Sequence, residues 1–270
     1  MTDRPTGNYP LERRAAEFER LRLQGETMAA DAAVMLDRIG VRPGWRCLDI
    51  GCGIGGITGL LAERAGPGGR VVGLDADPAF LDHARAHARH PVQFVQGDAY
   101  AADLPAGSFD LVHARFVAST AGQPERLIAE AMRLARPGGT VALQDPDMTA
   151  LEVHPAHPAW DRLKAALVGA FAATGADINL GRRLYAMLRR AGLADVQYRP
   201  FLIGVRPGDA MRDYLPATVE SLRGTVTGRG LMDAAALDAD LAACRAHLAD
   251  PDTVFTTYAV AQVWGRTPGG

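Results

Sequence analysis

The chain has 270 residues, of which 48% are hydrophobic and 22% charged, and its formal net charge is −2. These values are those of an ordinary globular protein and give no reason to expect nucleic acid as a partner, although Arg182-Arg183 and Arg189-Arg190 form a local basic patch. No apolar run approaches the ~20 residues that cross a bilayer, and the N-terminus lacks a signal-peptide core. We therefore expect one α/β domain with additions, a cytoplasmic location and no membrane partner.

The cysteines and histidines give no metal signature. Cys47, Cys52 and Cys244 form no disulfide or metal framework, which predicts reduced thiols. His83 and His87 lie four residues apart on one helical face, a spacing that a metal tolerates, but no acid or thiol completes the ligand set. The sequence therefore predicts no metal site.

Two helices are expected ahead of the first strand. Residues 1–10 are polar and broken by prolines and a glycine, whereas apolar residues recur at helical spacing over 11–21 and again over 28–39, with Gly25 between the two runs. We expect residues 1–40 to form a helical lid, and the first ten residues to become ordered only when a ligand binds.

A glycine turn follows the first strand. Residues 45–50 fit a buried strand, and a helical apolar pattern begins after the glycines. Glycine lets the backbone approach a ligand without a Cβ in between. Gly51, Gly53 and Gly56 fit the dinucleotide fingerprint G-x-G-x-x-G, and Asp75 lies at about the distance of its ribose-binding acid. A dinucleotide is therefore one possible ligand of this turn.

The charge beside the turn favours a different ligand. Asp49 stands at the end of the strand, next to the position that a pyrophosphate would occupy. A carboxylate there repels an anion and attracts a cation. S-adenosylmethionine (SAM) carries an ammonium and a sulfonium group and has no phosphate. Asp49 therefore favours SAM over a dinucleotide.

Strands and helices continue to alternate after the turn. Buried strands are expected at 70–75, 91–96, 109–115 and 140–144, with helices between them that begin at prolines. This alternation predicts a doubly wound, mostly parallel sheet, which binds its ligand at the carboxyl ends of its strands.

Groups that can bind a ligand fall at these strand ends. They are the backbone of the glycine turn after the first strand, Asp75 after the second, Asp98 after the third and Arg115 at the end of the fourth. Their coincidence at one edge of the sheet predicts a single ligand site. His113, which lies inside the fourth strand, is expected to be structural.

The C-terminal half completes the sheet and adds helices. We expect helices over 160–173 and 181–191, a sixth strand over 195–203 and a final antiparallel strand over 253–264. The segment 206–252 is helical and is expected to build part of a substrate chamber. The predicted fold is α/β, with a doubly wound seven-stranded sheet, N-terminal helices and a helical insertion before the last strand. Residues 41–270 would form the ligand-binding domain.

The motifs resemble those of a known family. Asp49-Ile50-Gly51-Cys52-Gly53-Ile54-Gly55 is similar to the D-x-G-x-G-x-G motif of the class I SAM-dependent methyltransferases, which have a Rossmann-like fold. Gly97-Asp98-Ala99, Phe109-Asp110-Leu111-Val112 and Arg136-Pro137-Gly138-Gly139 resemble further motifs of that family. The resemblance is close over 41–145 and looser over 180–265, and it is greatest to small-molecule enzymes of the ubiquinone-biosynthesis and natural-product tailoring type.

The resemblance also departs from the family in two places. Relatives commonly carry an N-terminal Tyr and an R-L-x-x-Q segment, of which this chain keeps Tyr9 and, in part, the segment around Gln24. Relatives also commonly continue after the fourth strand with a run that ends in His, where this chain has 116–120 without one. If that His positions the substrate in relatives, this chain is expected to position its substrate differently or to have a different substrate.

Site residues follow from the resemblance and from the strand ends. The expected cofactor contacts are Tyr9, Gln24, Asp49, Gly51, Cys52, Gly53, Asp75, Ala76, Asp98, Ala99, Ala114 and Arg115. Phe116, Trp160 and Tyr214 are expected to line the substrate pocket. A general base is optional, and the candidates are His154, His157 and Asp145, with Asp147 beside them.

The predicted activity is methyl transfer. A nucleophilic O, N or C atom of a small molecule would displace the methyl group of SAM in line, leaving S-adenosylhomocysteine (SAH), and natural-product biosynthesis is the expected setting. Two alternatives stay open, namely a SAM-binding catalyst of cyclisation or rearrangement and a nicotinamide-dependent oxidoreductase. A homodimer is possible.

Overall fold

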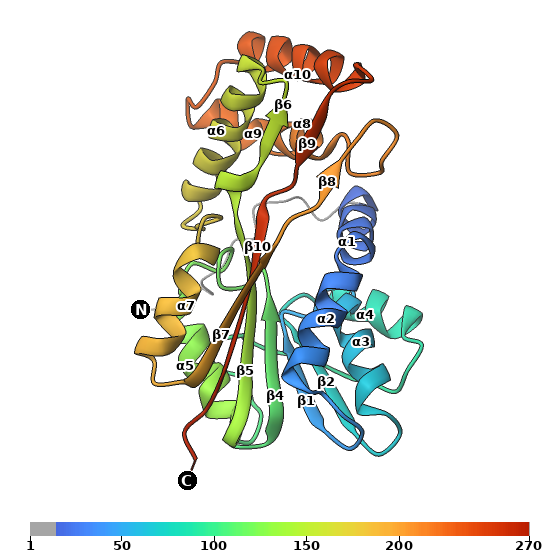
Figure 1. The fold of residues 1–270 in the computed structure, drawn as a ribbon, viewed down its shortest axis with the longest axis vertical. Helices are drawn as coiled ribbons and strands as arrows, with labels where there is room; N and C mark the ends of the chain where they lie inside the picture. Colours follow the sequence, from blue (N-terminus) through green and yellow to red (C-terminus); the bar gives the residue numbers. More distant parts are fainter. Residues whose placement is uncertain (1–14, 270) are drawn as a thin grey trace.

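A seven-stranded sheet forms the centre of the molecule (Figure 1). The computed structural model describes residues 15–269. The strand order is β3-β2-β1-β4-β5-β10-β7. The parallel strands are β1 (Arg46–Ile50), β2 (Arg70–Asp75), β3 (Gln93–Gln96), β4 (Phe109–Arg115) and β5 (Ala135–Asp147). β10 (Ala259–Arg266) runs antiparallel to β5 and to β7 (Ala194–Phe201). The predicted fold class is confirmed.

Helices cover both faces of this sheet. On one face α2 (Ala29–Ile39) and α3 (Gly56–Ala65) enclose a core with buried side chains of β1, β2 and β4. On the other face lie α5 (Pro124–Leu134) and α7 (Gly181–Arg190), while α4 (Pro78–His87) packs against β2 and β3. Strands that are buried on both faces explain the nearly continuous hydrophobic runs in the sequence.

A second layer, which we call the cap, stands over the carboxyl ends of the parallel strands (Figure 1). It contains a three-stranded antiparallel sheet in the order β6-β9-β8 and the four helices that pack around it. Its elements are β6 (Glu152–His154), α6 (Pro158–Ala172), β8 (Gly204–Val205), α8 (Tyr214–Ser221), α9 (Arg223–Gly228), α10 (Ala234–Ala249) and β9 (Val254–Thr256). Two separate chain segments therefore build the cap, whereas the sequence predicted one insertion over 206–252.

The prediction of one last strand over 253–264 is wrong, because this segment forms two strands that belong to two different sheets. β9 belongs to the cap and β10 to the large sheet, and the chain changes sheet at Thr257. The Thr257 backbone N–H donates to Ile203 O at 2.9 Å, and its hydroxyl accepts from the Ile203 N–H at 3.0 Å. This paired contact fixes the crossing point. The stretch 152–154 forms β6.

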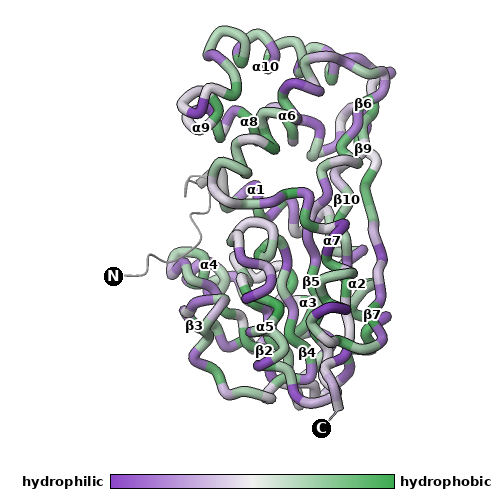
Figure 2. The backbone as a smooth tube through the Cα atoms, turned by 90° about the vertical axis from the view of Figure 1, so that its left-hand side faces the viewer, coloured by the Kyte–Doolittle hydropathy of each residue, from purple (hydrophilic) through white to green (hydrophobic). Residues whose placement is uncertain are grey.

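Helix α1 (Ala15–Thr27) lies between the cap and the sheet, as the view turned by 90° shows (Figure 2). It runs through Gly25, where the sequence predicted a break. Among residues 15–269, no helix combines the length and apolar character needed to cross a membrane.

Candidate active site

One cavity of about 830 Å³ lies where the carboxyl ends of β1, β2 and β4 meet the cap and α1. The expected cofactor residues that line it are Gln24, Asp49, Gly51, Cys52, Gly53, Asp75, Ala76, Asp98, Ala99 and Arg115. Phe116 and Tyr214, expected in the substrate pocket, line the same cavity. The strand-end argument thus leads to residues that share one space. Tyr9 lies outside the described residues.

The glycine turn holds strands β1 and β2 together. Gly51 has a φ of +65°, and a Cβ at this position would stand 2.3 Å from Val117 Cγ2, so only glycine fits. The Gly51 and Cys52 N–H groups both donate to Leu74 O, at 2.7 and 3.0 Å. The Gly53 N–H donates to Asp75 Oδ2 at 2.8 Å. Because these donors are engaged within the chain, they are not available as a cradle for a pyrophosphate.

Three carboxylates face the cavity from successive strand ends. Asp49, 2% exposed, accepts from Thr58 Oγ1 at 2.6 Å and contacts His113 Nδ1 at 2.8 Å. Asp75 accepts from the backbone at both oxygens, and each oxygen keeps a second lone pair. Burial raises the pKa of the Asp75 carboxyl above its usual range, and the two N–H donors oppose that shift. Asp98 is exposed and accepts from the Tyr100 N–H at 2.9 Å.

A buried guanidinium group lies opposite these carboxylates. Arg115 Nη1 is buried and has no hydrogen-bond partner in the structure. Its Nη2 atom would be 3.4 Å from a Cβ on Gly56 and 3.9 Å from one on Gly25, so the group fills the gap between α1 and α3. Burial lowers the pKa of the Arg115 guanidinium, and the nearby Asp49 carboxylate opposes that shift. Buried polar groups are normally satisfied, so the open Nη1 atom suits an acceptor group on a ligand.

The end of the cavity beneath the cap is aromatic. Phe116 packs edge-on against Tyr258, with ring centroids 6.1 Å apart, and Tyr214 lies 5.5 Å from the same tyrosine. The Tyr258 hydroxyl accepts from Gln24 Nε2 at 2.7 Å, which joins α1 to the start of β10. Burial raises the pKa of Tyr258. Met148, Phe171 and Ile178 add apolar wall.

Sequence reasoning missed Tyr258, Phe171 and Thr218, all of which line this end. Tyr258 was placed inside a strand, where its side chain had no reason to face a ligand. The break between β9 and β10 exposes it to the cavity.

The structure does not place the two histidines proposed as general bases at the cavity. Among residues 15–269, neither His154 nor His157 lines the cavity. His154 is exposed on β6. His157 caps α6 by accepting from the Ala159 N–H at 3.2 Å, and its ring stacks on His247 at 4.6 Å. Both side chains belong to the far side of the cap.

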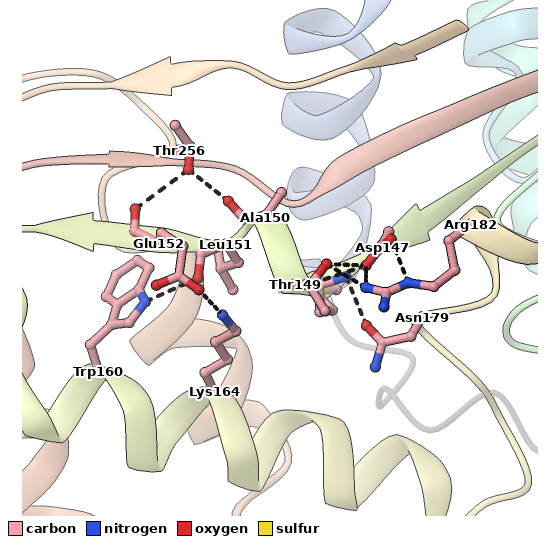
Figure 3. Close-up of polar contacts among 11 residues, drawn as sticks. Asp147, Thr149, Ala150, Leu151, Glu152, Trp160, Lys164, Asn179, Arg182 and Thr256 are labelled. Atoms are coloured by element: carbon pink, nitrogen blue, oxygen red, sulfur yellow. Dashed lines mark hydrogen bonds and ion pairs between the residues drawn. The ribbon is translucent and has the colours of Figure 1, made fainter. Parts of the chain in front are cut away.

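Trp160 and Asp147 do not line the cavity either, and both side chains are engaged by neighbouring residues (Figure 3). Trp160 is fully buried, and its Nε1 donates to Leu151 O at 3.3 Å. It was expected in the substrate pocket, but it belongs to the core of the cap. Asp147 accepts from Arg182 Nε at 2.7 Å and caps the short helix that follows β5. Ala114 is buried within β4 and does not line the cavity.

Asp145 does not line the cavity and lies behind Ser119, which does. It is fully buried and accepts from the backbone N–H of Ser119 at 2.9 Å, and Ser119 lines the cavity. Burial raises the pKa of Asp145 to about 7. The carboxyl group is therefore linked to the cavity wall through Ser119. His83 and His87 stack at 4.1 Å, and no metal-binding cluster is found among the described residues.

Comparison with known proteins agrees with this geometry. Residues 48–143 match the family described as a methyltransferase domain. Nocamycin O-methyltransferase of Saccharothrix syringae is 40% identical over 116 residues, which are 42% of this chain and 41% of that enzyme. The chain thus spans less than half the length of that relative.

Solved structures show the same fold. The YcgJ protein of Bacillus subtilis has a TM-score of 0.60 at 19% identity, covering 90% of this chain and all of that one. The [4+2]-cyclase SpnF has a TM-score of 0.51 at 20% identity, covering 88% of this chain and 81% of that one. The sheet order, the cavity at the carboxyl ends of its strands and the matched domain lead to one assignment: residues 48–143 are a methyltransferase domain, set in a Rossmann-like methyltransferase fold.

Proposed function

We propose that the protein transfers a methyl group from SAM to an O, N or C nucleophile of a small molecule. The proposal rests on the cavity, which has carboxylates at one end and aromatic side chains at the other. The acidic end suits a cationic ligand without phosphate, because its carboxylates attract a cation and the Gly51, Cys52 and Gly53 N–H groups are already engaged by β2. A nicotinamide dinucleotide would bring its pyrophosphate to the same acids.

Each strand end has a role in this proposal. The free lone pairs of Asp75 would accept from the ribose hydroxyls, and Asp98 with the following Ala99 N–H would take the adenine edge. The open Nη1 of Arg115 would donate to a carboxylate. When bound, SAM supplies the methyl group and a good leaving group.

The aromatic end would hold the acceptor. Phe116, Tyr214 and Tyr258 offer flat surfaces, and the cavity volume of about 830 Å³ is in the range of sites that enclose small molecules. We propose that α1 and the cap close over the acceptor, exclude water and align the nucleophile. The histidines that line the cavity among the described residues, His83, His87 and His90, lie on α4 or just after it, on the side of β2 and β3, so we expect alignment to contribute more than general-base catalysis.

We further propose a natural-product acceptor, since nocamycin O-methyltransferase is similar over 116 residues. Cyclisation or rearrangement without methyl transfer is the second candidate, because SpnF shares the fold. Calorimetry comes first: SAH is expected to bind and NAD is not. Incubation with radiolabelled SAM and a panel of small hydroxylated, amino and carbonyl acceptors then decides the chemistry. Transfer of label supports methylation, whereas product formation without mass gain and without SAH supports the second candidate. Tight NAD binding without SAH binding would refute both.

A further inference from the structure

A row of buried polar side chains crosses the sheet from the cavity to its far edge. Asp49 on β1, His113 on β4, Gln144 on β5 and Gln262 on β10 are each at most 2% exposed. Arg199 on β7 ends the row. The contacts are Asp49 Oδ1 to His113 Nδ1 at 2.8 Å, His113 Nε2 to Gln144 Nε2 at 2.9 Å, Gln144 Oε1 to Gln262 Nε2 at 2.9 Å and Gln262 Oε1 to Arg199 Nη1 at 2.7 Å. We call these five residues the polar ladder.

Arg199 fixes the direction of every bond in the polar ladder. A guanidinium group can only donate, so the atom of Gln262 that faces it must be the oxygen. The Gln262 amide nitrogen then donates to Gln144 Oε1 and also to Asp31 O at 3.0 Å. The Gln144 nitrogen is left to face His113 Nε2, which must accept.

This direction determines the protonation of His113. If Nε2 accepts, the ring is neutral and its one proton is on Nδ1, from which it donates to Asp49 Oδ1. Asp49 then receives two neutral donors, His113 and Thr58, and keeps its full negative charge. An imidazolium at the same place would pair with Asp49 and cancel much of the field at the end of β1.

We propose that the polar ladder is a positioning device that orients the Asp49 carboxylate and holds His113 neutral, so that the end of β1 favours the positively charged cofactor over its neutral product. This inference rests on the proposed use of SAM. Burying four polar side chains is costly unless each is satisfied, and the polar ladder, which ends at the half-buried Arg199, satisfies them in one direction. Arg199 also bonds Asp31 Oδ1 at 2.5 Å, so the same row anchors the start of α2.

The protonation state can be measured in the unmodified protein. The chain has seven histidines, and His113→Gln identifies which signal belongs to His113 in ¹⁵N NMR spectra of histidine-labelled protein. The expected signature at neutral pH is a neutral ring with its proton on Nδ1. An imidazolium, or a neutral ring protonated on Nε2, would overturn the proposal without any binding experiment.

Gln144→Glu tests the function of the polar ladder with a change of one atom. One carboxylate oxygen would keep the bond from Gln262, and the other would face His113 Nε2, so that the ring takes up a proton from solvent. The expected results are an imidazolium signal for His113 and a fall of about three- to tenfold in the preference for SAM over SAH, measured as the ratio of their Kd values. Gln197→Glu, the same change at an exposed site on β7, should alter neither.

The outcomes separate the two proposals. An imidazolium in Gln144→Glu with an unchanged SAM-to-SAH ratio would refute the role of the polar ladder. If the unmodified protein binds neither SAM nor SAH, the proposed function fails, and the NMR signature of His113 still decides the direction of the bonds.

Discussion

Replacing Arg115 by glutamine should separate ligand binding from stability. The guanidinium is buried at the junction of α1, α3 and the cavity, and Nη1 has no partner in the structure. If it binds the carboxylate of the methionyl group of SAM, the variant loses a hydrogen bond between charged groups. Such a bond contributes about 1.5–3 kcal/mol. The Kd for SAH should therefore rise roughly 10- to 150-fold.

The ligand-free protein, in contrast, should not lose stability. Burial lowers the pKa of Arg115, which means that the fold disfavours the charge it holds there. Removing a buried charge that is not fully paired is often neutral or stabilising. The free energy of unfolding without ligand should therefore stay the same or rise in Arg115→Gln.

Calorimetry with two ligands and thermal unfolding without ligand test this pair of expectations. Methylthioadenosine lacks the methionyl carboxylate, so its Kd should be the same in Arg115→Gln and in the unmodified protein. Arg229→Gln, at an exposed position of the cap, is the matched control and should change nothing. An unchanged Kd for SAH together with a lower free energy of unfolding would refute the reasoning and make Arg115 a structural residue.

Three further predictions concern the turn, the buried acid and a corrected histidine. Gly51→Ala should lower the free energy of unfolding by about 2 kcal/mol or more, because its Cβ would overlap Val117. Gly53→Ala has open space around it and should cost about 1 kcal/mol. Equal losses of the two variants in thermal unfolding would contradict this. Asp145 has a raised pKa in the fold, so it binds a proton there that the unfolded chain releases. The free energy of unfolding should fall by up to about 4 kcal/mol between pH 4 and 7, and Asp145→Asn should remove that slope in denaturant titrations. His157→Ala should leave turnover unchanged and cost about 0.5–2 kcal/mol as a lost helix cap; a large loss of turnover would restore it as a candidate base.

The central sheet could be predicted because its signals are local. Each strand is a short hydrophobic run, each helix begins or ends at a proline or glycine, and the polar residue at a strand end follows directly in the sequence. Asp49, Asp75 and Asp98 were found in this way, and the parallel arrangement brings them to one edge. The glycine turn was found for its shape, but the use of its N–H groups was not predicted, since their partners lie on β2.

The cap could not be predicted because its pairing is not local. Glu152 on β6 lies opposite Thr256 on β9, more than a hundred positions along the chain, and Gly204 on β8 lies opposite the same residue. Strands of two or three residues carry no periodicity of their own. His154 and His157 were proposed as general bases because nothing local in the sequence indicated that β6 and α6 would direct them away from the cavity.

The aromatic end of the cavity combines side chains from distant parts of the chain. Gln24 comes from α1, Phe116 from the loop after β4, Tyr214 from α8 and Tyr258 from the crossing between β9 and β10. Each element contributes one or two side chains, and none of these residues takes part in the hydrogen-bond ladders of β1 to β3. Substitutions here can therefore change the shape of the aromatic end without disturbing the acids at the strand ends. Charge and shape are thus set by separate parts of the chain: the ends of β1 to β3 fix the charge at one end of the cavity, and the cap, α1 and the loop after β4 fix the shape of the other.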